Sequence, residues 1–312
     1  MGVSRPAMNL EIQPERRRRR LSARGREALA FYLFLTPFFI GFLVFTIGPI
    51  LASLGLSFTH WNMFTPAHWV GLSNYQTLLT NDNTFWIALW NTVYYSFISI
   101  PLGILLALVL AVLLNQRIIF RRWFRAAFYL PSTIPVVASV MLWMWLLAPA
   151  GLFNEVLAVF GIKGPAWFVD PVWFKPGLIL MALWGAGGGT VLFLAGLQGI
   201  PAYLYEASAL EGASKIRQFF TITIPMLSPI ILFNLVMGII GGFQVFTQVY
   251  IVGMNNGDLM LEPYLFQTAF QNFDMGYASA LAWIMFIIII ALTLVVLKWS
   301  AAWVYYEGEV RQ

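Results

Sequence analysis

The sequence predicts an all-α, polytopic membrane protein with six transmembrane helices. Three observations support this fold class. Of the 312 residues, 60% are hydrophobic and only 10% are charged, against roughly 25% charged residues in soluble domains. The charged residues are clustered, which leaves long stretches without any. Lysine and arginine gather on alternate sides of these stretches, as they do around membrane helices. This composition excludes a soluble globular protein, a disordered chain and a nucleic-acid binder.

Six stretches without Asp, Glu, Lys or Arg define the expected spans. A helix needs about 20 apolar residues to cross a bilayer, and the stretches contain 54, 34, 29, 30, 40 and 23 residues. The first could hold two spans, but its second half is polar and rich in turn-forming residues. We therefore expect one span in each stretch. The expected spans are 29–56, 87–114, 126–148, 177–198, 227–251 and 278–298.

Three regions follow from these spans. We expect residues 1–28 to form a basic N-terminal tail, residues 29–298 a six-helix membrane domain, and residues 299–312 a C-terminal tail. The first apolar stretch is too long for the core of a signal peptide, and no small-residue cleavage site follows it. We therefore expect it to remain as an uncleaved first span.

Basic residues orient the expected spans. With the N-terminus in the cytoplasm, 16 Lys and Arg residues lie on the cytoplasmic side and only Lys163 and Lys175 on the outer side. Cytoplasmic loops carry such an excess of basic residues, so both termini are expected in the cytoplasm. The run from Arg16 to Arg20 is then expected to anchor the topology on anionic lipid, with a nucleic-acid patch as the weaker alternative.

Catalytic and metal-binding constellations are absent from the sequence. The expected spans contain no charged side chain apart from Lys298 at the end of the sixth, which argues against an ion-coupled transporter and an intramembrane enzyme. No G-x-x-x-x-G-K-[ST] phosphate loop occurs, so any ATP must be hydrolysed by another subunit. There is no cysteine, and His60 and His68 lie in one loop without a third ligand. We expect no catalytic residue and no metal site.

The segment 199–226 predicts two short cytoplasmic helices between spans 4 and 5. Pro201 can begin a helix, residues 202–211 are good helix formers, and Gly212 interrupts them before a second helix that reaches Pro225. A hairpin of this kind suits docking on a partner, but it can equally be an ordinary loop. The physical properties of the residues leave both interpretations open.

This segment resembles the EAA loop of ABC importer membrane subunits. Glu206, Ala207 and Ser208 precede Gly212 at the family spacing, and 222–225 match the end of the motif. Ser208 replaces the third motif residue and Ile224 replaces a leucine, and both changes are mild. Other segments are similar to the carbohydrate branch of the maltose/glycerol-phosphate type, and to the first permease of its pair. They are 56–62, 70–75, 125–131, 167–173 and 194–201, with Phe85–Trp86 and Asn91–Thr92.

The resemblance implies the type I importer permease fold and a five-part assembly in a bacterial or archaeal cell membrane. An extracellular sugar-binding protein delivers the carbohydrate, and a second, different permease completes the path. Two ABC ATPase subunits bind ATP and Mg²⁺, so this chain itself carries no cofactor. The residues implied in coupling to the ATPase are Glu206, Ala207, Ser208, Gly212, Ala213 and Ser214.

Span 5 carries a polar stripe. On an ideal helix, Asn234, Gly241, Gln244 and Gln248 share one face over about 21 Å. Amides on such a face either bind sugar hydroxyls or join helices inside the membrane. The family resemblance favours a role in the substrate path for residues 243–250.

Glycines are concentrated in spans 4 and 5. Residues 185–189 contain four glycines before Thr190, and Gly238 precedes Gly242 by four positions. This spacing is typical of close helix packing, and a locally opened helix beside a polar cavity is the alternative for 187–189. Because the resemblance places sugar contacts nearby in some relatives, Thr190 is a further candidate for the path.

Two other functions compete with the importer subunit. A self-contained six-helix channel or facilitator for small polar solutes has the same hydropathy pattern. A membrane enzyme acting on lipid-linked sugar would need an acid–base constellation, which the sequence lacks.

Because the sequence contains no cysteine, single introduced cysteines can test the expected topology. We expect a cysteine introduced at position 213 or 310 to react with a membrane-impermeant thiol reagent only after lysis. A cysteine at position 68 should react in intact cells. External labelling at 213, or labelling at 310 with protection at 68, would contradict the topology.

Overall fold

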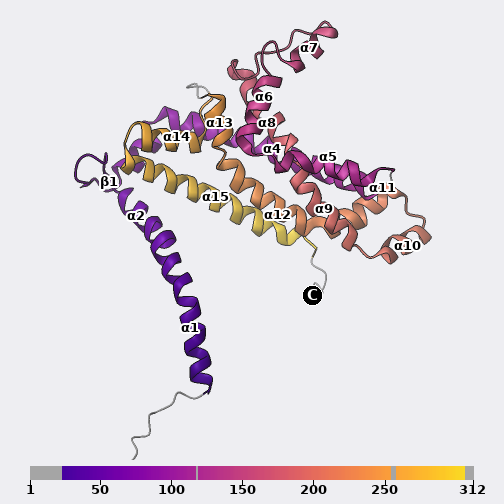
Figure 1. Ribbon diagram of the computed structural model, residues 1–312, viewed down its shortest axis with the longest axis horizontal. Helices are drawn as coiled ribbons and strands as arrows, with labels where there is room; N and C mark the ends of the chain where they lie inside the picture. Colours follow the sequence, from indigo (N-terminus) through magenta and orange to yellow (C-terminus); the bar gives the residue numbers. More distant parts are fainter. Residues whose placement is uncertain (1–22, 117–118, 254–257, 306–312) are drawn as a thin grey trace, which may run out of the picture. The chain divides into compact units, whose positions relative to one another are not determined.

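The computed structural model describes residues 23–116, 119–253 and 258–305, which are mostly helical (Figure 1). Four helical stretches in them are long and apolar enough to cross a membrane, and two bent helix pairs raise the number to six if each pair is one span. The all-α, multi-span class is therefore confirmed. The run from Arg16 to Arg20 and the tail residues 306–312 lie outside the described residues.

Residues up to Ser53 form a unit separate from the rest of the chain. The first candidate span is Ala30–Leu56, close to the expected 29–56. A π-helical turn directly precedes Gly48-Pro49, where the proline has no N–H for an α-helical bond. The elements are α1 (Ala23–Phe42), η1 (Leu43–Ile47) and α2 (Gly48–Leu56).

A short antiparallel hairpin follows the first span. Strand β1 (Thr59–His60) pairs with β2 (His68–Trp69), so that His60 lies opposite His68. The side chain of Asn74 donates to the carbonyls of Ser57 and Thr59, each at 2.9 Å, and fixes the hairpin on α3 (Ser73–Thr80). The long helix α4 (Asn83–Asn115) comes next and contains the second expected span.

The third expected span, 126–148, corresponds to two helices that meet at a sharp bend. Helices α5 (Arg121–Thr133) and α6 (Val136–Leu146) meet at an angle of 101°. The break falls at Ile134 and Pro135, because a residue before proline disfavours the α conformation; Ile134 is extended, with ψ of 133°. Helix α7 (Leu152–Val159) follows.

The fourth expected span, 177–198, is also bent. Helices α8 (Pro171–Trp184) and α9 (Gly187–Gly199) meet at 44°. Glycine is a poor helix former, and the break lies at Gly185 and Ala186. A side chain at Gly187 would overlap the carbonyl of Phe128 on α5, so this glycine permits close helix packing.

The fifth span begins earlier than the expected 227–251 and covers Lys215–Val252. Its helix passes through Pro225, because a π-helical turn again directly precedes the proline. The preceding hairpin consists of α10 (Ala202–Leu210) and α11 (Lys215–Gln218). The span continues as η2 (Phe219–Thr223), α12 (Ile224–Phe243) and α13 (Thr247–Val252).

The sixth span is one unbroken helix. Helix α14 (Leu261–Phe266) and η3 (Gln267–Gln271) lead into α15 (Met275–Trp303), which contains the expected 278–298. Beyond its end, the N–H of Tyr305 donates to Ser228 Oγ of α12 at 2.8 Å. The end of α15 is thus attached to the beginning of α12.

Helix α4 is central to the unit that follows residue 53, and it contacts α8, α9, α12 and α14 (Figure 1). Its buried face carries polar side chains as well as apolar ones. Apolar clusters fill the spaces around it, one against α6 and α8, one against α12 and α15, and one against α9 and α12. The buried polar residues of α4 are Asn91, Thr92, Ser96 and Ser99.

Two arginines of α5 cap the C-terminus of α4. Arg121 Nε donates to the carbonyl of Leu114 at 2.7 Å, and Arg125 donates to the same oxygen at 3.5 Å. The last carbonyls of a helix have no partner within the helix, and cations are favourable there. These residues, expected only to orient the protein in the membrane, therefore also complete a helix end.

Asp82 joins three elements through its two carboxylate oxygens. Oδ1 accepts from the N–H of Phe85 at 2.9 Å and caps α4. Oδ2 accepts from the hydroxyls of Tyr264 on α14 and Tyr277 on α15, both at 2.6 Å. Burial, together with the nearby carboxylate, raises the pKa of Tyr264, so this hydroxyl stays protonated and can donate.

We expect Asp82→Ala to lower the unfolding temperature of the purified protein more than Asp170→Ala does. Asp170 is the matched control, because it caps α8 through Val172 N at 2.9 Å and lacks the two tyrosine bonds that Asp82 accepts. A lost cap costs about 1 kcal/mol, whereas each hydrogen bond to a charged group contributes roughly 1.5–3 kcal/mol. Equal decreases in a thermal unfolding assay would contradict the role of the tyrosines.

Candidate functional site

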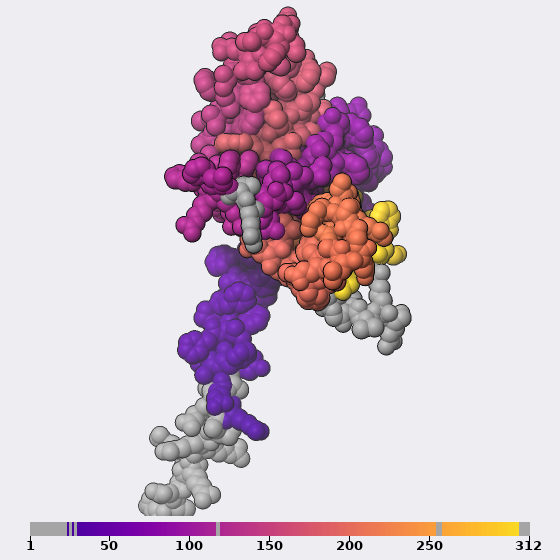
Figure 2. All heavy atoms as spheres, turned by 90° about the vertical axis from the view of Figure 1, so that its right-hand side faces the viewer, coloured from indigo at the N-terminus to yellow at the C-terminus, as the bar shows by residue number. Residues whose placement is uncertain are grey.

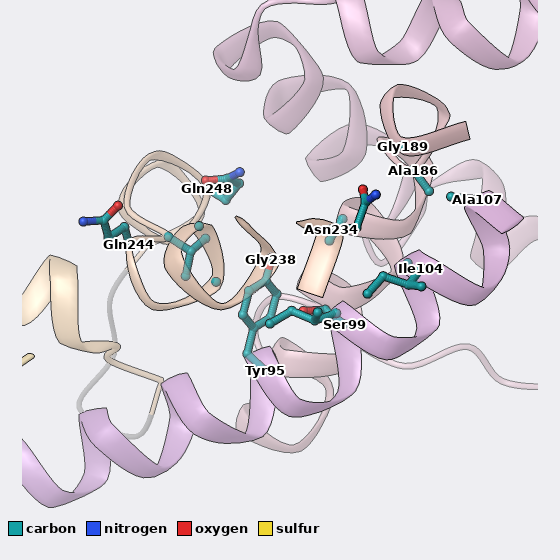
Figure 3. Close-up of a pocket in the computed structure, with 16 residues that line it drawn as sticks. Tyr95, Ser99, Ile104, Ala107, Ala186, Gly189, Asn234, Gly238, Gln244 and Gln248 are labelled. Carbon is teal, nitrogen blue, oxygen red and sulfur yellow. The ribbon is translucent and has the colours of Figure 1, made fainter. Parts of the chain in front are cut away.

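A cavity of about 360 Å³ opens between α4, the α8–α9 break and the α12–α13 break (Figure 3). It brings together three of the four side chains expected in the substrate path, Asn234, Gln244 and Gln248. None of its lining residues is charged. The lining residues that carry polar side chains are Tyr95, Ser99, Asn234, Gln244 and Gln248.

The two glutamines reach the cavity by a different geometry from the expected one. Helix α12 ends at Phe243, and α13 begins only at Thr247, so the stripe does not lie on one continuous helix. Figure 3 shows both glutamines toward one end of the cavity and Asn234 farther along it. The break exposes backbone inside a predicted span, which membrane proteins tolerate where it is covered by protein or lines a polar cavity.

Asn234 has a free acceptor beside a glycine. Its Nδ2 donates to the carbonyl of Ile230 in the same helix at 2.8 Å. A side chain at Gly189 would lie 3.4 Å from Asn234 Oδ1, so the glycine leaves this oxygen open on that side. Gly189 and Ala186 both line the cavity.

The glycine pair of α12 packs on α4. An added Cβ at Gly238 would lie 2.7 Å from a methyl carbon of Ile100, and one at Gly242 would lie 2.8 Å from Ser96 Oγ. Small residues allow this close approach, as expected for the spacing. Both glycines also line the cavity, so packing and cavity formation depend on the same positions.

Thr190 lies apart from the other candidates. Its side chain is only 3% exposed, and its hydroxyl donates to the carbonyl of Ala186 at 3.2 Å. It lines a different cavity of about 400 Å³ beside α5, together with Arg125. The structure therefore does not bring Thr190 together with Asn234 and the glutamines.

Tyr95 and Ser99 were missed at the sequence level. They lie one turn apart on α4 and line the cavity opposite α12. A signal was available, because polar residues recur at 91, 92, 95, 96 and 99 within a charge-free span. This spacing of three and four places them on one helix face.

The hairpin of residues 199–226 has the expected two-helix form. Gly212 has φ of +81°, a conformation that other residues rarely adopt. The side chain of Ser214 caps α11 by accepting from Arg217 N at 3.3 Å, and Ala213 N donates to the carbonyl of Ser208 at 3.0 Å. These bonds fix the turn without any partner.

The outer face of this hairpin is exposed and partly apolar. Glu206 and Ala207 are exposed, and Leu210 is 91% exposed. Tyr203 and Ile216 are exposed as well. Figure 2 looks onto this end of the molecule and shows the orange surface of the hairpin facing the viewer. Glu211 is exposed as well. An exposed surface with apolar side chains beside carboxylates is suited to contact with another protein.

No group of three or more His, Cys, Asp or Glu side chains that could hold a metal ion occurs among the described residues. His60 and His68 face each other across the short hairpin.

Comparison with known proteins identifies the family to which the chain belongs. Residues 99–305 match the family described as binding-protein-dependent transport system inner membrane component. The chain is similar to the probable ABC transporter permease protein YesP of Bacillus subtilis, with 42% identity over 91% of this chain and 94% of the relative. The arabinooligosaccharides transport system permease protein AraP of the same organism is 34% identical over 89% of this chain and 90% of the relative.

A third relative is archaeal, the trehalose/maltose transport system permease protein MalF of Thermococcus litoralis. It is 32% identical over 88% of this chain and 94% of the relative. Among solved structures, the fold is similar to a chain of a bacterial ABC transporter involved in the import of the acidic polysaccharide alginate. The TM-score is 0.78 at 24% identity, over 89% of this chain and 96% of the other. The importer permease fold implied by the sequence is confirmed.

We expect Gln244→Leu and Gln248→Leu each to reduce substrate uptake several-fold without reducing assembly. Leucine suits a membrane helix but removes the amide from the cavity. Thr190→Val is the control, because its hydroxyl lies in the other cavity. Uptake in whole cells and recovery of the purified complex are the measurements. Normal uptake in both variants would show that the amides are silent, and loss of assembly would show that they join helices.

Proposed function

Because the chain belongs to the family of binding-protein-dependent transport system inner membrane components, we propose that it forms half of the translocation path of an ATP-driven sugar importer. A member of this family is a membrane component of a transport system and not an enzyme. The family match also argues against the alternative function of a self-contained channel or facilitator.

The observation that carries the proposal is the uncharged polar cavity of α4, α9, α12 and α13. Its hydroxyl and amide groups can donate and accept hydrogen bonds, which suits sugar hydroxyls. Charged groups are absent from its lining, which suits passage of a neutral solute with little cost of desolvation. The related AraP and MalF proteins are named for arabinooligosaccharides and for trehalose and maltose, which supports carbohydrate as the class of substrate.

The proposed assembly has five parts. An extracellular sugar-binding protein delivers the substrate, and a second, different permease supplies the other half of the path. Two ABC ATPase subunits bind ATP and Mg²⁺ in the cytoplasm. One similar solved structure is described as an alginate ABC transporter in complex with a periplasmic protein that holds an alginate pentasaccharide, which supports the binding protein as a partner.

We place both termini and the hairpin of α10 and α11 in the cytoplasm. The 16-to-2 distribution of basic residues supports this orientation. Glu206, Ala207 and Ser208 then face the ATPase from α10, while Gly212, Ala213 and Ser214 set the turn. Closure of the ATPase pair on nucleotide would move this hairpin and open the cavity alternately to each side.

The hairpin assignment is tested by Gly212→Val with Gly212→Asn as the matched control. Nothing lies within 4 Å of a Cβ added at Gly212, so only its backbone conformation matters. Valine in that conformation costs roughly 1–2 kcal/mol, whereas asparagine adopts it readily. We expect the valine variant to insert normally but to lose most ATPase co-purification and uptake, and the asparagine variant to keep both. Normal ATPase recovery with valine would remove the coupling role of the turn.

A further inference from the structure

Buried polar side chains fasten the hairpin to the beginning of the fifth span. We propose that Gln218, together with Tyr205 and Thr223, is a positioning residue that makes α10 and the span Lys215–Val252 move as one piece. This inference rests on the proposed docking of the hairpin on the ATPase. It adds a defined mechanical connection between that hairpin and the cavity.

Gln218 is the first of these connections. Its side chain is only 2% exposed. Its Nε2 donates to the backbone carbonyl of Tyr205 on α10 at 3.1 Å, and its Oε1 accepts from Lys215 Nζ at 3.3 Å. A buried amide is costly unless its groups are bonded. Gln218 is therefore satisfied only while α10 stays in its place beside α11.

A second connection joins the same residue of α10 to the next turn of the span. The hydroxyls of Tyr205 and Thr223 lie 2.9 Å apart and share a hydrogen bond. Thr223 is only 5% exposed and belongs to the π-helical turn η2. Tyr205 is thus held through both its backbone and its side chain, directly before Glu206 on the exposed face.

Apolar packing and polar bonds both hold the hairpin at this point. Leu204 and Tyr205 of α10 pack against the apolar cluster around α9 and α12. A cavity of about 740 Å³ lies between α4 and the hairpin. On the hairpin side it is lined by Tyr205, Lys215, Gln218 and Thr223, and on the α4 side by Val112, Asn115 and Gln116. The Gly212 turn has open space around it. The polar bonds therefore add fixed, directional connections to an apolar contact that leaves this space unfilled.

The fifth span continues from these bonds to the cavity that holds the glutamines. Residues Lys215–Val252 form one helical stretch, broken only near Gln244. A displacement of α10 that reaches Gln218 and Thr223 would thus travel along α12 to the cavity. If the bonds are removed, the ATPase should still bind the exposed face while its movement no longer reaches the path.

The experiment measures sugar imported per ATP hydrolysed by the complete complex in liposomes, with the binding protein present. Gln218→Leu removes the bond of this side chain to α10 together with its bond to Lys215. We expect the loss of the bond to α10 to lower this ratio about five-fold, while ATPase co-purification stays normal. Thr221→Val is the matched control. Thr221 lies in the same π turn but is exposed, and it bonds only the carbonyl of Arg217 within its own helix. Its ratio should not change.

A second set of variants covers the possibility that Gln218→Leu misfolds. Tyr205→Phe and Thr223→Val each remove one partner of the same bond, so each should lower the ratio, and the double variant should lower it no further. An unchanged ratio in all variants, or a fall matched by equal loss of ATPase recovery, would overturn the inference. The proposed docking of the hairpin is tested separately from this inference. Normal recovery of the ATPase with the Gly212→Val variant would contradict the docking.

Discussion

The close approach of α12 to α4 is the contact on which the rest of the helical unit depends. In a lipid environment, apolar side chains gain little by leaving the solvent, so helices associate through packing and hydrogen bonds. Gly238 and Gly242 bring the backbone of α12 against Ile100 and Ser96. The same glycines leave the space into which Tyr95, Ser99 and Asn234 project. The packing that holds the unit together therefore also shapes its polar cavity.

The sequence was sufficient for the approximate place of the apolar stretches, because a charge inside a bilayer is costly and the absence of charge is easily recognised in a sequence. It did not reveal the sharp bend at Ile134-Pro135, since hydropathy records where a residue can be buried and not the direction of the chain. The break at Gly185 lies directly before residues 187–189, for which an opened helix was only the alternative interpretation. The left-handed turn at Gly212 was predictable, because few residues other than glycine adopt that conformation.

The candidate site was predicted in part and for a partly incorrect reason. Gln244 and Gln248 were grouped by assuming one ideal helix, yet they reach a common cavity because the helix breaks between them. Thr190 was expected with them, but which side of α9 faces α5 depends on packing that the sequence of one span does not contain. Tyr95 and Ser99 share a face of α4, but a charge-free apolar stretch by itself predicts only a span.

The arginine cap on α4 affects how the orientation of this protein can be manipulated. Arg121 and Arg125 contribute to the excess of positive charge on the side proposed to be cytoplasmic, and they also bond the carbonyl of Leu114. Neutralising them to invert or weaken the insertion bias would leave a helix end without its partners. Redesigning the insertion signal is thus safest in the N-terminal arginine run. Altering Arg121 and Arg125 would change the folding stability of the protein as well as its insertion into the membrane.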